Sequence, residues 1–161
     1  MVRGSYPMVR PLANAALART GTHRYSAATP MIEMEISRVL FRDDDDHQFV
    51  FLKEKTGERG FPIVIGSYEA AEIRRKLKDQ AMQRPLTHDL IGRVLRTLGW
   101  RLERIVVNDL KQDTFFALLV LQNGEQTEEV DCRPSDAIAL ALQVKCPIFV
   151  EESVLDSVSQ S

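Results

Sequence analysis

The chain has 161 residues, which fits one domain, and its 44% of apolar residues are enough to build a core. No apolar run approaches the ~18 residues that span a bilayer, so we expect a cytoplasmic protein with no membrane partner. Two cysteines, Cys132 and Cys146, do not make a disulfide framework, and we expect reduced, buried thiols rather than a metal pair, because no histidine lies near them in the sequence.

The net charge of −2 is unevenly spread along the chain. Residues 1–30 hold four arginines and no acid, so the remaining residues carry −6. An acidic body argues against broad, salt-driven binding to a phosphate backbone, although it leaves room for a local cationic site.

Residues 1–30 have the composition of a disordered leader, rich in Ala, Ser, Thr, Pro and Arg and without an alternating pattern. An acid-free, Arg-bearing start is also typical of a targeting segment, and a third interpretation is that translation begins at Met31, where ordered pattern starts. We favour a disordered tail or a misplaced start, followed by one domain over residues 31–158.

The first half of that domain predicts three strands and then a helix. Alternating apolar and charged residues indicate a strand from Ile32 to about Phe41, and the acidic run 43–46 predicts a solvated hairpin loop rather than a metal site. Residues 49–53 and 61–65 follow as strands. A helix is expected over 68–78, with Ser67 as its N-cap and with Ala70, Ile73 and Leu77 on its buried face.

The second half begins with a helix over 88–98, for which Thr87 is the expected cap. Leu86 and Ile91 occupy the two positions of a hydrophobic staple, and Gly99 ends the helix. Pro134 suits the first position of a later helix, where its missing N–H costs nothing. The remaining expected elements are strands 102–107, 115–122 and 127–131, helix 134–144, strand 148–150 and a helical turn over 153–158.

This order predicts an α+β fold with a mixed or antiparallel sheet and helices. A shift of 67 residues also aligns the two halves, so that residues 63–70 fall on residues 130–137. Both segments run from a strand into a helix whose first turn carries an acid followed by Ala. We therefore predict an internal duplication of a strand–strand–strand–helix unit, which would place Glu69 and Asp136 in related positions.

Three polar clusters are candidates for chemistry: Glu69 with Glu72, Thr87-His88-Asp89, and residues 131–136. Each has a structural explanation, because an acid in the first turn of a helix interacts favourably with the helix dipole by about 0.3–1 kcal/mol. Hydroxyl side chains there can simply cap backbone N–H groups.

The third cluster is the densest, with two carboxylates, a hydroxyl and a guanidinium at a strand-to-helix junction. Helix N–H groups at such a junction can hold a phosphate, and Arg133 could donate two parallel hydrogen bonds to it. Asp131 and Asp136 could hold Mg²⁺ or Mn²⁺, which prefer oxygen ligands. His88 could move a proton near neutral pH, although a histidine at a helix start is often only a surface or capping residue.

Two stretches resemble the hallmark motifs of the bifunctional nuclease family. They are Arg84-Pro85-Leu86-Thr87-His88-Asp89-Leu90 and the run from Asp131-Cys132-Arg133-Pro134-Ser135-Asp136 through Ala137-Ile138-Ala139-Leu140-Ala141-Leu142. Phe61-Pro62-Ile63-Val64-Ile65-Gly66, followed by Glu69-Ala70, is similar to a third motif. The resemblance covers about residues 34–154.

The resemblance implies an α+β fold with a mixed sheet, a homodimer or higher homo-oligomer, and activity on both DNA and RNA. The polar positions of the motifs fall on Glu69, His88, Asp89, Asp131, Arg133, Ser135 and Asp136. Cys132 departs from the small Ala or Ser more common at its position.

Our leading hypothesis is a phosphodiester hydrolase assisted by a divalent metal. Asp131 and Asp136, with Glu69, would hold Mg²⁺ or Mn²⁺, Arg133 would clamp the phosphate, and His88 or Asp89 would move the proton. Ser135 completes the expected catalytic set. The rival is a non-catalytic nucleic-acid-binding or protein-binding regulatory domain in which Arg133 pairs with Asp131 or Asp136, and the acidic body and the lack of a familiar catalytic signature favour it.

Overall fold

The computed structural model describes residues 30–42 and 47–159. The expectations for residues 1–29 and for the acidic run 43–46 lie outside these described residues.

Within the described residues, seven strands form one sheet in the order β3-β2-β1-β7-β4-β5-β6. The α+β fold with a mixed sheet is confirmed, because most neighbours are antiparallel and β7 runs parallel to β4. The strands are β1 (Met31–Leu40), β2 (His47–Glu54), β3 (Gly60–Gly66), β4 (Arg101–Lys111), β5 (Thr114–Asn123), β6 (Gln126–Cys132) and β7 (Ile148–Glu151).

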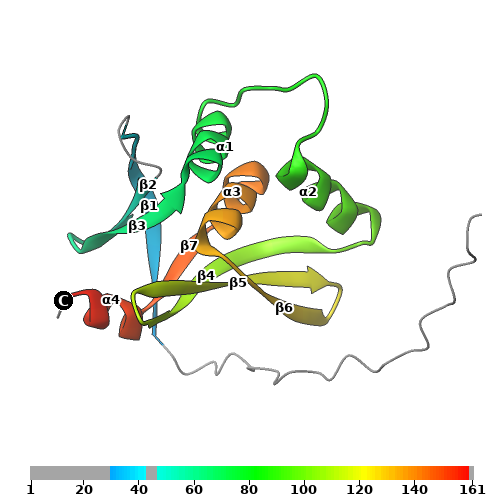
Figure 1. Cartoon of the computed structure of the whole chain (residues 1–161). Coiled ribbons are helices and arrows are strands. Elements are labelled where there is room, and N and C mark those ends of the chain that lie inside the picture. The colour runs from blue at the N-terminus through cyan, green and yellow to red at the C-terminus, as the bar shows by residue number, and fades with distance from the viewer. Residues whose placement is uncertain (1–29, 43–46, 160–161) are drawn as a thin grey trace, which may run out of the picture.

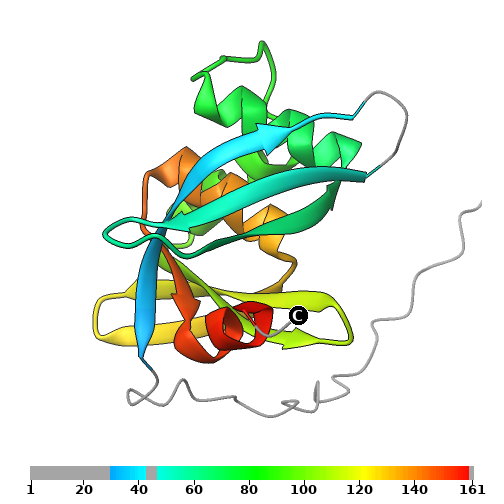
Figure 2. The ribbon, with the colours of Figure 1, turned by 90° about the vertical axis from the view of Figure 1, so that its left-hand side faces the viewer.

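The strand β1 joins the two halves of the sheet. Its first residues, Met31 to Met34, pair with β7, whereas the stretch from Met34 to Leu40 pairs with β2. A register shift lies between Ile36 and Arg38; such an irregularity increases the local twist and bends the strand. Figure 2 shows β1 passing from the lower strands of the molecule to the upper ones.

Four helices accompany the sheet in the described part of the chain: α1 (Ser67–Leu77), α2 (Thr87–Thr97), α3 (Pro134–Val144) and α4 (Glu152–Ser159). The helix α3 contacts α1, α2, β4 and β5, whereas α4 packs on β4 and β7. Figure 1 shows α3 between α1 and α2 above the sheet. None of the helices in the described ranges is long and apolar enough to cross a membrane.

The central position of α3 follows from its sequence. Five consecutive residues, 137–141, are all almost completely buried, as expected for a helix that is apolar on every side. Three of the five are alanines, whose small side chains let neighbouring elements approach closely. On α2 the buried residue is Gly92, where an added Cβ would lie 2.3 Å from Nε2 of Gln143 on α3. The small residues therefore hold α2 against α3.

The predicted N-caps are wrong for two helices. Ser67 and Thr87 are the first helical residues rather than caps, and the N-caps are Gly66 and Leu86. At α2 the capping interaction comes from Asp89, whose carboxylate accepts a hydrogen bond from the Leu86 N–H at 2.9 Å.

The predicted staple at α2 is wrong for the same reason, since the helix begins one residue earlier than expected. Leu86 and Ile91 no longer occupy the staple positions, and both are exposed. They join Leu90, Val94 and Leu98 on the outward side of α2, where each side chain is between 37% and 65% exposed.

The buried face of α1 also differs from the prediction in part. Ala70 and Ile73 are fully buried as expected, but Leu77 is 47% exposed and the charged Glu72 is buried in its place. The strand β4 extends several residues beyond its expected range and β5 extends one residue at each end, because they pair with each other along almost their whole length. The helix α3 has the predicted bounds.

The internal duplication stays a prediction. The sheet order places β3-β2-β1 on one side of β7 and β4-β5-β6 on the other. Each set of three strands leads into a helix, α1 or α3, that carries an acid in its first turn.

Ile138 on α3 is completely buried, so truncating it would leave a cavity between the helix and the sheet. We expect Ile138→Ala to lower the free energy of unfolding by about 2–5 kcal/mol, measured by urea denaturation. The matched control is Ile91→Ala on the exposed side of α2, which should change stability by about 0.5 kcal/mol or less. Equal losses in the two variants would contradict the central role of α3.

Candidate functional site

Five charged or titratable side chains from α1, α2 and the start of α3 form a connected cluster, which we call the ring. Arg133 binds Asp136 through two hydrogen bonds of 2.8 and 3.0 Å and binds Oε1 of Glu69 at 2.8 Å. Nε2 of His88 lies 3.1 Å from Asp136, and its Nδ1 lies 3.8 Å from Oε1 of Glu72. Glu69 and Glu72 are the two ends of this series of contacts and lie three residues apart on one surface of α1.

The helix starts bring this ring together. Arg133 is the N-cap residue of α3, with an extended backbone conformation, and Pro134 then fixes the first helical position. Asp136 and Glu69 both lie in the first turn of their helices, where the positive end of the helix dipole favours a carboxylate. The site therefore sits where α1 and α3 begin.

Gly66 leaves the space that the Glu69 carboxylate occupies. A Cβ added at residue 66 would lie 2.4 Å from Oε2 of Glu69, which is closer than non-bonded atoms approach. The absence of a side chain at the N-cap of α1 thus lets Glu69 fold back over the helix start and reach Arg133.

Exposure differs around the ring. The side chain of Arg133 is 65% exposed, whereas those of His88 and Glu72 are 13% and 9% exposed. The Asp136 side chain is intermediate, at 27%. The guanidinium is thus the part of the ring that a dissolved ligand reaches first.

A second set of ion pairs extends from Glu72 towards α2. Arg75 donates to both oxygens of Glu72, at 2.6 and 2.8 Å, and to Asp89 at 3.0 Å. Lys76 binds Asp89 and also Oε1 of Gln143 on α3, at 2.5 Å. These contacts hold α1, α2 and α3 in one arrangement behind the ring.

The ion pairs keep the carboxylates charged. Hydrogen bonds from Arg75 lower the pKa of Glu72, against the opposing effect of burial. Burial alone would raise the pKa of Asp136, but the hydrogen bonds from Arg133 and His88 outweigh it and lower the pKa. Burial would likewise raise the pKa of Asp89, but Lys76, the Leu86 N–H and Arg75 lower it to about 2.

Asp131 and Ser135 do not join the ring. Asp131 pairs in register with Leu118, and the next residue, Cys132, pairs with Ala117 in the core beneath α3. Since successive side chains of a strand point to opposite faces, Asp131 lies on the face of the sheet away from α3. Ser135 is buried at 6% exposure, and its hydroxyl makes none of the contacts of the ring.

The three predicted metal ligands therefore do not converge. Glu69 and Asp136 share Arg133 as a partner, and Asp131 is on the other face of the sheet. Over residues 30–42 and 47–159, no three His, Cys, Asp or Glu side chains are close enough to hold an ion. The predicted trio does not fit a divalent ion in this arrangement.

Both cysteines are free thiols with intermediate exposure. Burial raises the pKa of Cys132 to about 12 and that of Cys146 to about 11, so neither thiol is ionised at neutral pH.

The sequence prediction missed the residues that support the ring from behind. No contact within the chain was predicted for Arg75 and Lys76, yet their side chains are only 12% and 7% exposed. A signal was present, because Glu72 precedes them by three and four residues, the spacing of helical ion pairs. Gln143 carried no such signal, because its contact with Lys76 spans 67 residues.

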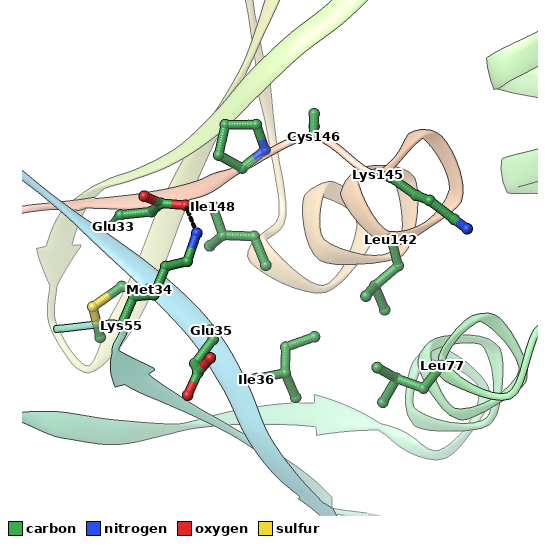
Figure 3. A pocket seen from close by; sticks show the side chains of 11 residues that line it. Glu33, Met34, Glu35, Ile36, Lys55, Leu77, Leu142, Lys145, Cys146 and Ile148 are labelled. Carbon is green, nitrogen blue, oxygen red and sulfur yellow. Dashed lines mark hydrogen bonds and ion pairs between the residues drawn. The ribbon is translucent and has the colours of Figure 1, made fainter.

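A pocket of about 530 Å³ lies at the C-terminal ends of α1 and α3. Figure 3 shows Leu77 of α1 and Leu142 of α3 beside Ile36 of β1, with Lys145 at the rim. None of the ring residues lines this pocket. The ring is consequently a separate surface site.

Comparison with known proteins gives the relatives of the chain. The sequence model of the bifunctional nuclease domain matches residues 50–161, a range that contains the whole ring. An uncharacterized protein of Mycobacterium tuberculosis is 38% identical over 125 residues, which cover 78% of this chain and 74% of that protein.

Two plant proteins are more distant. Bifunctional nuclease 1 of Oryza sativa subsp. japonica is 26% identical over 122 residues, which are 73% of this chain and 37% of the rice protein. Bifunctional nuclease 1 of Arabidopsis thaliana is 24% identical over 110 residues, which are 66% of this chain and 34% of that protein. The matched region is thus about a third of each plant protein.

Asp89→Asn tests the ion pairs behind the ring. The pKa of Asp89 in the folded protein is about 2, below its usual value of 3.8. The charged carboxylate therefore stabilises the fold above pH 3.8, and this stabilisation is lost as the pH falls towards 2. At pH 7 we expect the variant to be less stable by on the order of 1–2 kcal/mol, with the difference shrinking between pH 4 and pH 2.

Urea denaturation at a series of pH values measures this difference. The control is Asp156→Asn on the exposed side of α4, which should follow the wild type at each pH. A difference for Asp89→Asn that stays constant from pH 7 to pH 2 would mean that the charge of Asp89 does not stabilise the fold.

Proposed function

This chain belongs to the bifunctional nuclease domain family, and we propose that it is a phosphodiester hydrolase acting on DNA and RNA. One observation carries the proposal: an exposed guanidinium, that of Arg133, is held in a fixed orientation beside a carboxylate–imidazole pair. The names of the rice and Arabidopsis relatives support the same class of activity.

Arg133 is the proposed phosphate-binding group. Its bonds to Asp136 and Glu69 use three of the five N–H donors of a guanidinium and leave two for another acceptor. Both carboxylates hold the group in place before a substrate arrives, and this lowers the entropic cost of binding. Positive charge fixed at this point would stabilise the negative charge that builds up on phosphate oxygens during hydrolysis.

His88 and Asp136 are the proposed proton-transfer pair. The carboxylate of Asp136 contacts Nε2 of His88, so it can orient the imidazole and stabilise the protonated form of His88. In the proposed step, the oxygen of a water molecule forms a bond to phosphorus and its proton passes to this pair. One ester P–O bond breaks, and the departing oxygen takes this proton from the pair to become a hydroxyl group.

The carboxylate of Asp89 has another role in this proposal. It is bound by Lys76, Arg75 and the Leu86 N–H, and its low pKa makes it a poor base. We assign it to the positioning of α2, which carries His88. The participation of Mg²⁺ or Mn²⁺ stays a prediction, and no step is derived through an ion because Glu69, Asp131 and Asp136 do not meet.

A binding domain without catalysis is the second candidate. It is favoured by the internal ion pair between Arg133 and Asp136, which was the expectation for a structural role of this arginine. On that view the ring fixes the helix starts, and nucleic acid binds without being cleaved.

Arg133→Lys distinguishes these candidates, because lysine keeps the charge but loses the planar fork that binds two acceptors at once. For a hydrolase we expect kcat/KM on a single-stranded oligonucleotide to fall by about 100-fold or more. The measurement is cleavage by protein that has been purified free of contaminating nucleases.

The matched control is Arg59→Lys. Arg59 also lies between two carboxylates, those of Glu54 and Glu152, but it is not part of the ring. Its variant should cleave at the wild-type rate. Nucleic acid binding without any product, in wild type and both variants, would rule out the hydrolase and leave the binding domain.

Asp136→Asn and Asp131→Asn test which carboxylate acts. We expect Asp136→Asn to lower kcat/KM by about 100-fold or more, as for the loss of positioned proton transfer, and Asp131→Asn to keep the wild-type value. Both variants are assayed over a range of Mn²⁺ concentrations. A loss of activity in Asp131→Asn that high Mn²⁺ restores would contradict this arrangement and assign Asp131 to a metal site.

A further inference from the structure

Tyr68 is the most exposed of the large apolar or aromatic side chains in the described part of the chain. Tyr68 is the second residue of α1 and is 92% exposed. The next most exposed, Leu98, reaches 65%. Over residues 30–42 and 47–159, Tyr68 makes none of the aromatic stacking or cation–π contacts. The aromatic side chain in each of these contacts is a phenylalanine.

The position of Tyr68 on α1 places it at the border of the ring. It directly precedes Glu69, which binds Arg133. It also lies four residues before Glu72, so Tyr68 and Glu72 are on the same side of the helix, one turn apart. That side faces α2, because Glu72 contacts His88 and Arg75 contacts Asp89. Tyr68 is thus an exposed aromatic side chain one residue from Glu69, the partner of Arg133.

We propose that Tyr68 is a base-stacking residue that selects single-stranded nucleic acid for the site at Arg133. This inference rests on the proposed function and names its substrate class. One nucleobase would lie against the Tyr68 ring while the adjoining phosphate binds Arg133. A base inside a duplex has both faces covered by its neighbours, so unpaired bases in single strands, loops and ends would be the ones recognised.

The charge of the molecule supports stacking as the main source of affinity. Residues 31–161 carry −6, which opposes binding by many phosphate contacts. A neutral base is not repelled by Glu69 and Glu72, and stacking on an aromatic side chain does not need a basic groove. One arginine and one aromatic ring would therefore suffice for a local, sequence-tolerant contact.

The test compares two fluorescently labelled oligonucleotides that have the same backbone. One carries all its bases, and in the other the bases are replaced by abasic spacers. For Tyr68→Ala we expect kcat/KM on the base-bearing strand to fall about 10-fold, within the range for loss of one stacked base, and no change on the abasic strand. Tyr68→Phe keeps the ring and should retain the preference for bases.

The matched control is Leu98→Ala, which removes another highly exposed side chain, at the far end of α2. It should behave as wild type on both strands, and thermal unfolding should show that all variants are folded. An equal loss on the base-bearing and abasic strands would overturn stacking, and so would no loss on either.

Dissociation constants from fluorescence anisotropy separate this inference from the proposed function. If the wild type binds but does not cleave, the hydrolase fails, and the inference stands only if Tyr68→Ala weakens binding of the base-bearing strand alone. If the wild type neither binds nor cleaves a single strand, both are overturned.

Discussion

The burial of α3 is the constraint on which the rest of the structure depends. Its residues 137–141 are closed off from water by the sheet below and by α1 and α2 on its two sides. Because three of them are alanines and Gly92 faces α3, the neighbouring helices come close enough for side chains at the helix starts to meet. The ring at Arg133 is thus a consequence of core packing: polar groups that are far apart in sequence are brought together by the apolar helix between them.

The fold was largely predictable because the local signals agree with the tertiary structure. Alternating apolar and charged residues predicted the first strand, and Pro134 marked the start of α3. The failures have physical causes. Ser67 and Thr87 were assigned as N-caps from capping preferences, but each is the first helical residue. At α2 the carboxylate of Asp89 accepts the Leu86 N–H from inside the helix. Leu77 fits the apolar spacing of α1, yet α1 buries Glu72 instead, because Arg75 and Lys76 neutralise it.

The candidate site was predictable only in part. The family motifs included Glu69, His88, Arg133 and Asp136, and the structure brings these four residues together. They could not show that Asp131 points to the other face of the sheet, because this depends on its pairing with Leu118. Nor could they show that Lys76 reaches Gln143, since no local pattern links residues on different helices. Contacts within one helix are visible in a sequence, whereas contacts across helices depend on packing.

The missing side chain at Gly66 has a consequence for how the site can vary. A methyl group there would push the flexible end of Glu69 aside without disturbing the core, because the atoms it meets belong to that carboxylate alone. Arg133 would then keep Asp136 but lose its second anchor. A substitution at residue 66, which is outside the ring, can therefore change how firmly the Arg133 guanidinium is oriented. Every charged residue of the ring would remain in the sequence.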